Sequence, residues 1–164
     1  MTVKHFFKYG LSGLGPVLIL IQFVPVDRDN PPVKSELVAP PEVKAVLRES
    51  CYDCHSNETV WPWYSHVAPI SWMIIRDIHR ARDEYNLSEW ELMDPEKQSE
   101  IREEMWEMAS EGRMPPLLYR LAHPEARVSG EELAVLRLWL LADVVDGEKE
   151  GGQRRRRRRR GRDR

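Results

Sequence analysis

The strongest constraint in this sequence is a run of five residues, Cys51-Tyr52-Asp53-Cys54-His55, which contains the only two cysteines of the chain. Two thiols at this spacing can form a disulfide-exchange pair, half of a zinc site, a structural disulfide or the attachment site of a c-type haem. Each of these uses needs different partners elsewhere in the fold. The residues around the run therefore indicate which of these four uses applies.

The histidine directly after the second cysteine favours haem attachment. In a Cys-x-x-Cys-His run both sulfurs bond to one porphyrin, while the imidazole of His55 lies next to the iron as its proximal ligand. A zinc site would need further Cys or His partners, and the chain has no second cysteine pair. A thiol redox pair would be expected after a strand, and no such context precedes Cys51. We predict one covalent haem c per chain, held by Cys51, Cys54 and His55, with thiol redox and metal binding as the less favoured alternatives.

Apolar residues recur at helical spacing along the chain, and no run alternates in the way a strand would. Ser88 with Glu91 and Ser129 with Glu132 have the spacing of capping boxes at helix starts. The expected helices cover residues 41–50, 70–85, 95–112 and about 129–143. The predicted fold class is therefore all-α, in one small domain.

The N-terminus has the order of an export signal, with charged residues before an apolar run. Lys4, His5 and Lys8 precede the apolar run over 11–26, which ends without a small-residue cleavage site. We expect residues 1–26 to act as an uncleaved signal and membrane anchor, although the run is short against the ~20 residues of a spanning helix. A cleaved signal or a peripheral segment stays open. The positive N-terminal flank would place the rest of the chain on the periplasmic side of a bacterial inner membrane.

Composition divides the remainder of the chain into three parts. Residues 27–41 are punctuated by proline and are expected to form an extended tether, followed by a haem c-binding domain over 42–146. Residues 147–164 are expected to form a disordered, Arg-rich tail.

The distribution of charge limits the classes of partner. Residues 151–164 carry nine of the 25 Lys and Arg residues but one of the 27 Asp and Glu residues, so the rest of the chain is acidic. Such a body gives no reason to expect nucleic-acid binding. The tail could contact anionic lipid or an acidic redox partner protein, whose identity the sequence does not give.

Further motifs accompany the cysteine run and together resemble a known family. They are Asp27-Arg28-Asp29-Asn30-Pro31-Pro32-Val33, Cys51-Tyr52-Asp53-Cys54-His55-Ser56-Asn57, Trp61-Pro62-Trp63-Tyr64-Ser65, Pro69-Ile70-Ser71-Trp72 and Gly112-Arg113-Met114-Pro115-Pro116. Over roughly residues 27 to 142, and in the short hydrophobic N-terminus, the chain resembles the bacterial haem-binding domain family. The resemblance implies a single covalent haem c in an exported, often membrane-tethered protein. The order of elements is also similar to that of small cytochromes c, which implies a cytochrome c-like helical domain around the haem.

The ligand on the far side of the iron is expected to be Met114. This residue lies between Gly112-Arg113 and Pro115-Pro116, in a stiff loop that is similar to the Met-Pro loop of cytochromes. His66 is the alternative, and a second histidine ligand would lower the reduction potential. Trp63 and Tyr64 lie near the motif in sequence and are expected to pack on the porphyrin.

These expectations favour an electron carrier over an enzyme. The protein is expected to be an exported, membrane-anchored, monohaem c-type cytochrome that transfers single electrons, with no substrate bond broken. The alternative is a peroxidase-like haem enzyme or a haem-based sensor, either of which needs an open or exchangeable distal site. The distal ligand discriminates between the two classes.

Overall fold

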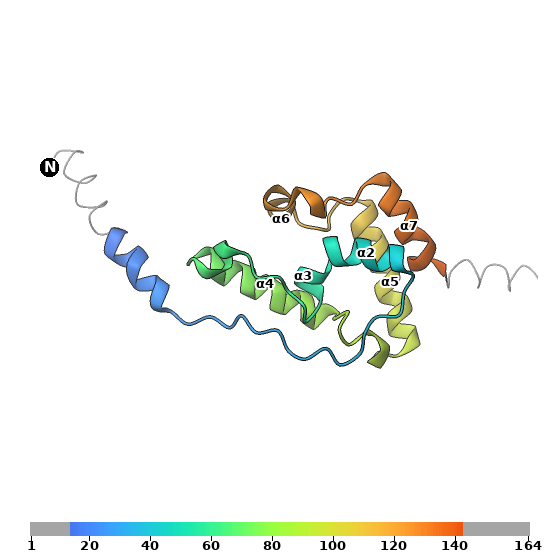
Figure 1. Cartoon of the computed structure of the whole chain (residues 1–164), viewed down its shortest axis with the longest axis horizontal. Helices are drawn as coiled ribbons and strands as arrows, with labels where there is room; N and C mark the ends of the chain where they lie inside the picture. Colours follow the sequence, from blue (N-terminus) through green and yellow to red (C-terminus); the bar gives the residue numbers. More distant parts are fainter. Residues whose placement is uncertain (1–13, 143–164) are drawn as a thin grey trace, which may run out of the picture.

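The computed structural model describes residues 14–142 and shows a helical protein (Figure 1). Its α-helices are α2 (Pro41–Ser50), α3 (Tyr52–His55), α4 (Ile70–Glu84), α5 (Pro95–Ser110), α6 (Leu117–Ala122) and α7 (Gly130–Leu140), and its 3-10 turns are η1 (Ile21–Phe23), η2 (Trp63–His66), η3 (Trp90–Leu92) and η4 (Pro124–Ala126). Residues 14–20 are also helical and lead into η1. Over 14–142 no strand forms apart from an isolated bridge between Ser35 and Glu89. The predicted all-α class is confirmed.

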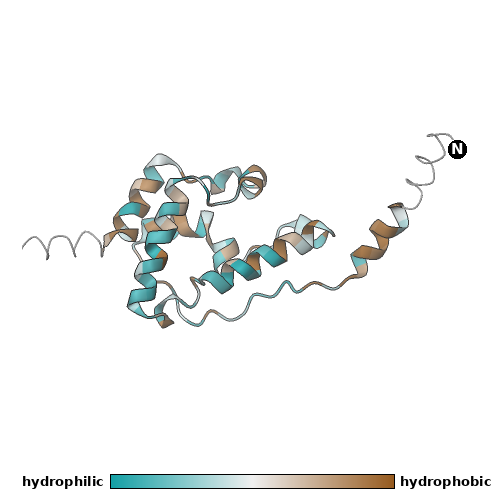
Figure 2. Ribbon diagram, turned by 180° about the vertical axis from the view of Figure 1, so that it is seen from behind, coloured by the Kyte–Doolittle hydropathy of each residue, from teal (hydrophilic) through white to brown (hydrophobic). Residues whose placement is uncertain are grey.

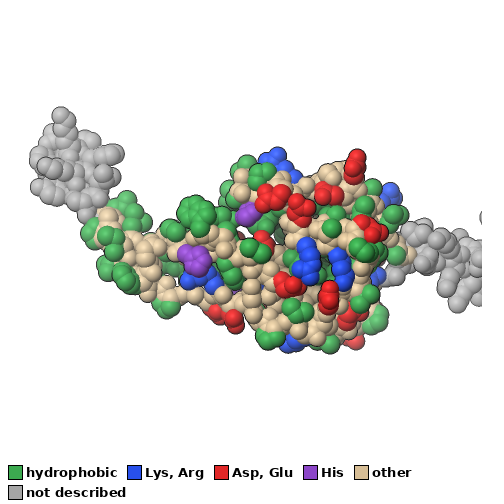
Figure 3. All heavy atoms as spheres, in the orientation of Figure 1, with side chains coloured by type: hydrophobic (Ala, Val, Ile, Leu, Met, Phe, Trp, Pro, Cys, Tyr) green, Lys and Arg blue, Asp and Glu red, His purple; other side chains and the backbone are tan. Residues whose placement is uncertain are grey.

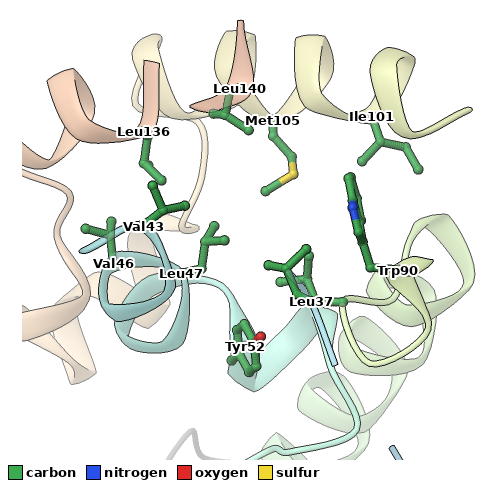
Figure 4. Packing of buried hydrophobic residues seen from close by; sticks show 11 residues of the cluster. Leu37, Val43, Val46, Leu47, Tyr52, Trp90, Ile101, Met105, Leu136 and Leu140 are labelled. Atoms are coloured by element: carbon green, nitrogen blue, oxygen red, sulfur yellow. The ribbon is translucent and has the colours of Figure 1, made fainter. Parts of the chain in front are cut away.

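The hydrophobic core lies between α2, α5 and α7. Figure 4 shows the side chains of these helices pointing toward one another, with Leu37 and Trp90 closing one side. The core consists of Leu37, Val43, Val46, Leu47, Tyr52, Leu87, Trp90, Ile101, Met105, Leu136 and Leu140. One face of α2 is buried through Val43, Val46 and Leu47. Burial of this face fixes the orientation of α2, and therefore the position of Cys51, which directly follows it.

Two arms extend from this core on either side of α3. Figure 1 shows α4 as one arm and α6 as the other, both directed away from α5 and α7. Because α3 follows α2 with only Cys51 between them, the cysteine motif lies at the base of the two arms.

The two expected capping boxes have different outcomes. Ser129 accepts a hydrogen bond from the backbone N–H of Glu132, whose carboxylate accepts one from Ser129, so α7 begins with the predicted box. Ser88 begins no box, because its hydroxyl accepts the backbone N–H of Asn57 at 2.9 Å. The chain after it forms the short turn η3, and α5 begins later, at Pro95.

The proline-rich segment has no helix and lies against the domain (Figure 1). The backbone N–H groups of Lys34 and Ser35 donate to the carbonyl of Ser88 at 3.0 and 2.9 Å. Asn30 donates to the carbonyl of Thr59 at 2.9 Å, and Leu37 is wholly buried in the core. This stretch therefore contributes to the packing of the domain as well as leading into it.

The N-terminal and C-terminal predictions lie partly outside the described residues. The charged start of the signal (1–13) and the Arg-rich tail both fall outside 14–142. Between residues 14 and 142, no helix has both the length and the apolar character needed to cross a membrane.

Candidate haem site

The end of α2 and the single turn of α3 position the cysteine motif. The backbone N–H of Cys51 donates to the carbonyl of Leu47 at 2.8 Å, so Cys51 continues the last turn of α2. The N–H of His55 then donates to the carbonyl of Cys51 at 2.9 Å. This turn places both cysteines and His55 along one wall, while Tyr52 points into the core.

His55 is buried, and one of its ring nitrogens already contacts backbone carbonyl groups. Its side chain is 6% exposed, and Nδ1 lies 3.1 Å from the carbonyl oxygen of Ala81 and 3.4 Å from that of Tyr85. Because carbonyl oxygens only accept hydrogen bonds, Nδ1 must carry the hydrogen. The lone pair is therefore on Nε2, which is the tautomer a metal-ligating histidine needs.

The environment of His55 also keeps its ring neutral and oriented. Burial lowers the pKa of the imidazole, and the two carbonyl contacts oppose that shift. The ring of Tyr85 stacks on the ring of His55 with centroids 4.0 Å apart and planes 9° from parallel. A neutral, stacked imidazole has both its charge state and its rotation fixed before any iron is bound.

The two thiols are free, and their environment disfavours the thiolate. Burial, and then the charge of Cys54, raises the pKa of Cys51 to about 12. Burial, and then the charges of Asp53 and Asp77, raises the pKa of Cys54 to about 11. Disulfide exchange depends on a lowered thiol pKa, so this site is unlike that of a thiol oxidoreductase.

The described part of the chain also offers no set of residues for a zinc ion. Over 14–142, no group of three or more His, Cys, Asp or Glu side chains is placed to hold a metal ion. Within this range the fold therefore brings the cysteine pair no further His, Cys, Asp or Glu ligands of the kind that a zinc site needs.

Two adjoining cavities open beside the motif, and together we call them the motif cleft. Both are lined by Cys51, His55, Tyr85 and Met114. The first reaches the core, where its apolar walls include Leu47, Met105, Leu136 and Leu140. The second, of about 250 Å³, lies between α4 and the chain from Met114 to Tyr119. An apolar cleft that brings two thiols, an imidazole and a thioether together fits a covalently held haem.

Met114 reaches the cleft because of the way α5 ends. Gly112 has a φ of 66°, and the N–H groups of Arg113 and Met114 both donate to the carbonyl of Met108, at 2.9 and 3.1 Å. This closing turn places Met114 beside buried Pro115 at the wall of both cavities. Met105 and Met108 line the first cavity as well, so three thioethers lie around the site.

The structure does not bring the predicted aromatic residues or His66 to the motif cleft. Trp63 is 78% exposed, and neither Trp63 nor Tyr64 lines either cavity. The hydroxyl of Tyr64 instead lies 2.6 Å from Nε2 of His123. His66 is exposed at the end of η2 and lines a separate cavity.

Other residues at the site were not singled out from the sequence. Tyr85 and the carbonyl of Ala81 position His55, and Tyr119 lines the second cavity. Apolar residues at helical spacing over 70–85 predict that Tyr85 is buried, but they do not show that it contacts His55. For Tyr119 the sequence holds no local signal, since its contact with the motif joins distant segments.

Loop contacts after the motif hold it in place. The N–H of Leu87 donates to the carbonyl of His55 at 2.7 Å, and the hydroxyl of Thr59 donates to the carbonyl of Asp53 at 2.7 Å. The carboxylate of Asp53 accepts the N–H of Val60 at 2.9 Å. Backbone groups of the motif are thus satisfied within the domain, which leaves the two thiols and the imidazole to face the cleft.

Comparison with known proteins gives the family. The sequence model of the family described as the haem-binding domain matches residues 16–142, which includes the whole motif cleft. No curated protein and no solved structure matches the chain. Since the matched region is most of the chain, this protein belongs to the haem-binding domain family.

Proposed function

We propose that this protein is an exported, membrane-anchored, monohaem c-type cytochrome that carries single electrons on the periplasmic side of a bacterial inner membrane. The family supports haem binding.

One observation carries the proposal. Cys51, Cys54, His55 and Met114 all line the second cavity of the motif cleft, which is the donor set of a His/Met haem c. The hydrogen bonding of His55 Nδ1 to backbone carbonyls supports the same assignment of His55 as an iron ligand, because it leaves Nε2 free to bind the metal.

The residues would act in separate roles. Cys51 and Cys54 would each add an S–H bond across one vinyl group and so hold the porphyrin by two thioethers. His55 would ligate iron through Nε2, with its orientation kept by Tyr85 and the Ala81 carbonyl, and Met114 would hold the iron through its thioether sulfur. Leu47 and Leu136 would exclude water from the cleft. When bound, the haem would supply a one-electron couple whose potential depends on these ligands and on burial.

The partners are also part of the proposal. The N-terminal segment would hold the protein at the membrane, and the Arg-rich tail would strengthen contact with anionic lipid or with an acidic redox partner. A tail contact of this kind weakens as salt is raised, because exposed charges are screened within about a Debye length.

Absorption spectra of the full chain, produced with a haem c maturation system, test the proposal. We expect a thioether-type haem spectrum, a ferric sulfur-to-iron band in the near infrared and no shift of the reduced spectrum with carbon monoxide. A haem that can be extracted without breaking covalent bonds would contradict type c attachment. Ready carbon monoxide binding would contradict the closed distal site and favour the enzyme or sensor alternative.

Paired methionine variants identify the distal ligand. Met114→Ala should remove the near-infrared band, lower the potential and open the iron to carbon monoxide. Met108→Ala is the matched control, since Met108 lines the first cavity but not the second. We expect the control to keep the near-infrared band and to stay closed to carbon monoxide, because its thioether is not the proposed ligand. An unchanged spectrum in Met114→Ala, or loss of the band in Met108→Ala, would reject the assignment of Met114.

A further inference from the structure

Exposed apolar side chains gather at the end of the domain farthest from the core helices. We call this surface the apolar end face and define it by Trp63, Val67, Ile70 and Met73. Its most prominent member is Trp63, whose side chain is 78% exposed. A cluster of this kind on the surface of a domain marks an interaction surface, because scattered single residues would need no explanation but a group does.

The polarity of α4 changes along its length. Its first turn exposes Ile70 and Met73, while the following turns expose Arg76, Asp77 and Arg80. The apolar character is therefore confined to the beginning of the helix instead of following one side of it. This arrangement suits an end-on contact, in which the tip enters an apolar medium and the rest of α4 stays in water.

The apolar end face is continuous with the N-terminal helix. The amide of Gln22 donates from Nε2 to the carbonyl of Ala68 at 3.1 Å, and its Oε1 accepts the N–H of Ala68 at 2.9 Å. This double hydrogen bond joins the helix over 14–23 to the turn between η2 and α4. Figure 2 shows that helix as almost wholly hydrophobic, and Ile19, Leu20 and Phe23 are exposed on it.

A polar cavity lies at the junction of the two apolar surfaces. It has a volume of about 240 Å³ and is lined by Arg28 and His66, together with Gln22 and residues 23–26. Figure 3 shows a histidine and basic side chains at this end of the molecule, among the hydrophobic side chains of the face and the helix. A cationic cavity bordered by apolar surface complements a phospholipid, whose phosphate lies directly above its acyl chains.

We infer that the apolar end face lies in the headgroup region of a phospholipid bilayer, beside the N-terminal helix, with a lipid phosphate at Arg28 and His66. The inference rests on the proposed membrane anchoring and goes beyond it, because it assigns a fixed docking surface to the domain. Trp63 suits this position, since tryptophan concentrates at membrane–water interfaces. With Gln22 bonded to Ala68, the domain would be held against the membrane at its η2 end.

A site-specific photo-crosslink tests the inference. The photoreactive residue p-benzoylphenylalanine replaces Trp63 in the full, haem-loaded chain, in vesicles of equal parts phosphatidylcholine and phosphatidylglycerol. The matched control carries it at Leu138, which is 79% exposed and lies on α7 at the other end of the domain. We expect lipid adducts at position 63 and only background at position 138.

Flotation of the same vesicles separates the two claims. If the chain does not float with vesicles, the proposed anchoring fails and the docking inference fails with it. If it floats but position 63 gives no more lipid adduct than position 138, anchoring stands and the inference is overturned. Crosslinks at position 63 to a second protein or a second copy, in place of lipid, would also overturn it.

A second variant tests the role of the Gln22 contact. Gln22→Leu keeps the helix apolar but removes both hydrogen bonds to Ala68. We expect flotation to persist and the lipid adducts at position 63 to fall toward the level at position 138. Unchanged adducts would show that Gln22 does not hold the face at the bilayer, and the assignment of a fixed docking geometry would be withdrawn.

Discussion

The hydroxyl of Tyr119 donates a 2.7 Å hydrogen bond to Oδ2 of Asp53, the residue between the two cysteines of the motif. Tyr119 lies on α6, and its ring also stacks on His123 with centroids 4.5 Å apart. His123 in turn lies 2.6 Å from the hydroxyl of Tyr64 on η2. The bond to Asp53 joins α6 to the segment that holds the cysteines, beside the cavity that Tyr119 lines.

Removing the Tyr119 hydroxyl should destabilise the protein without changing the shape of the core. Tyr119→Phe leaves one oxygen of Asp53 without its donor, and we expect the free energy of unfolding to fall by about 1–2 kcal/mol. Urea denaturation of the haem-loaded protein measures this. Leu118→Ala is the control on the same helix, because Leu118 is exposed and should change little. An equal loss in both variants would contradict a specific role for the hydrogen bond.

The wild type and Tyr119→Phe should differ in how their stability responds to alkaline pH. Burial, and then the hydrogen bond to Asp53, raises the pKa of Tyr119 above its usual value of about 10. Above that pH the unfolded chain loses the proton while the folded protein keeps it, so stability falls as pH rises. The advantage of the wild type over Tyr119→Phe should therefore be full at pH 8 and smaller at pH 11. A constant difference, measured by denaturation at both values, would contradict the raised pKa.

Local signals in the sequence predicted the helices well. The apolar repeat of Val43, Val46 and Leu47 gave the buried face of α2, and the Ser129–Glu132 box gave the start of α7. The Ser88–Glu91 pair has the same spacing, yet Ser88 serves the distant N–H of Asn57. Spacing alone does not tell whether a hydroxyl is used locally or across the fold, because the N–H of Glu91 finds another acceptor in the hydroxyl of Ser35, at 3.2 Å.

The site could be predicted only where its residues are close in sequence. The run from Cys51 to His55 predicts haem attachment from its residue types and spacing alone. The turn after Gly112 indicates a fixed position for Met114. Proximity in sequence failed for Trp63, which is near the motif in the chain but exposed on the apolar end face. The support given by Tyr85 and Tyr119 depends on how α4 and α6 pack, and no local pattern encodes that packing.

Arg82 should be essential for holding the extended segment on the domain. Its guanidinium donates to the carbonyls of Ser56 and Asp29 at 2.8 and 3.0 Å, and to the side chains of Asn30 and Thr59 at 3.0 and 2.9 Å. A lysine ammonium cannot reproduce this planar, multiple donation. Arg82→Lys should lower the free energy of unfolding by about 1–3 kcal/mol and expose the segment to proteases.

Limited proteolysis with identification of the cleavage sites measures the second effect of Arg82→Lys. Arg76→Lys is the control on the same helix, since Arg76 forms an exposed contact with Asp77 and exposed ion pairs contribute little to stability. We expect new cleavage within residues 27–40 in the first variant and a wild-type pattern in the second. Equal resistance of both would show that the remaining contacts, such as those of Lys34 and Ser35 with Ser88 and the burial of Leu37, hold the segment without Arg82.

Leu47 connects the hydrophobic core with the motif cleft, and its truncation should affect both. The side chain is 0% exposed, belongs to the core and lines the first cavity. Leu47→Ala should lower the free energy of unfolding by about 2–5 kcal/mol through lost burial and the cavity left behind. Leu92→Ala, at a residue exposed on η3, makes the same chemical change and should cost little. Because a larger cavity admits water beside His55, Leu47→Ala should also shift the reduction potential measured by redox titration, whereas an unchanged potential would show that this wall does not shield the site.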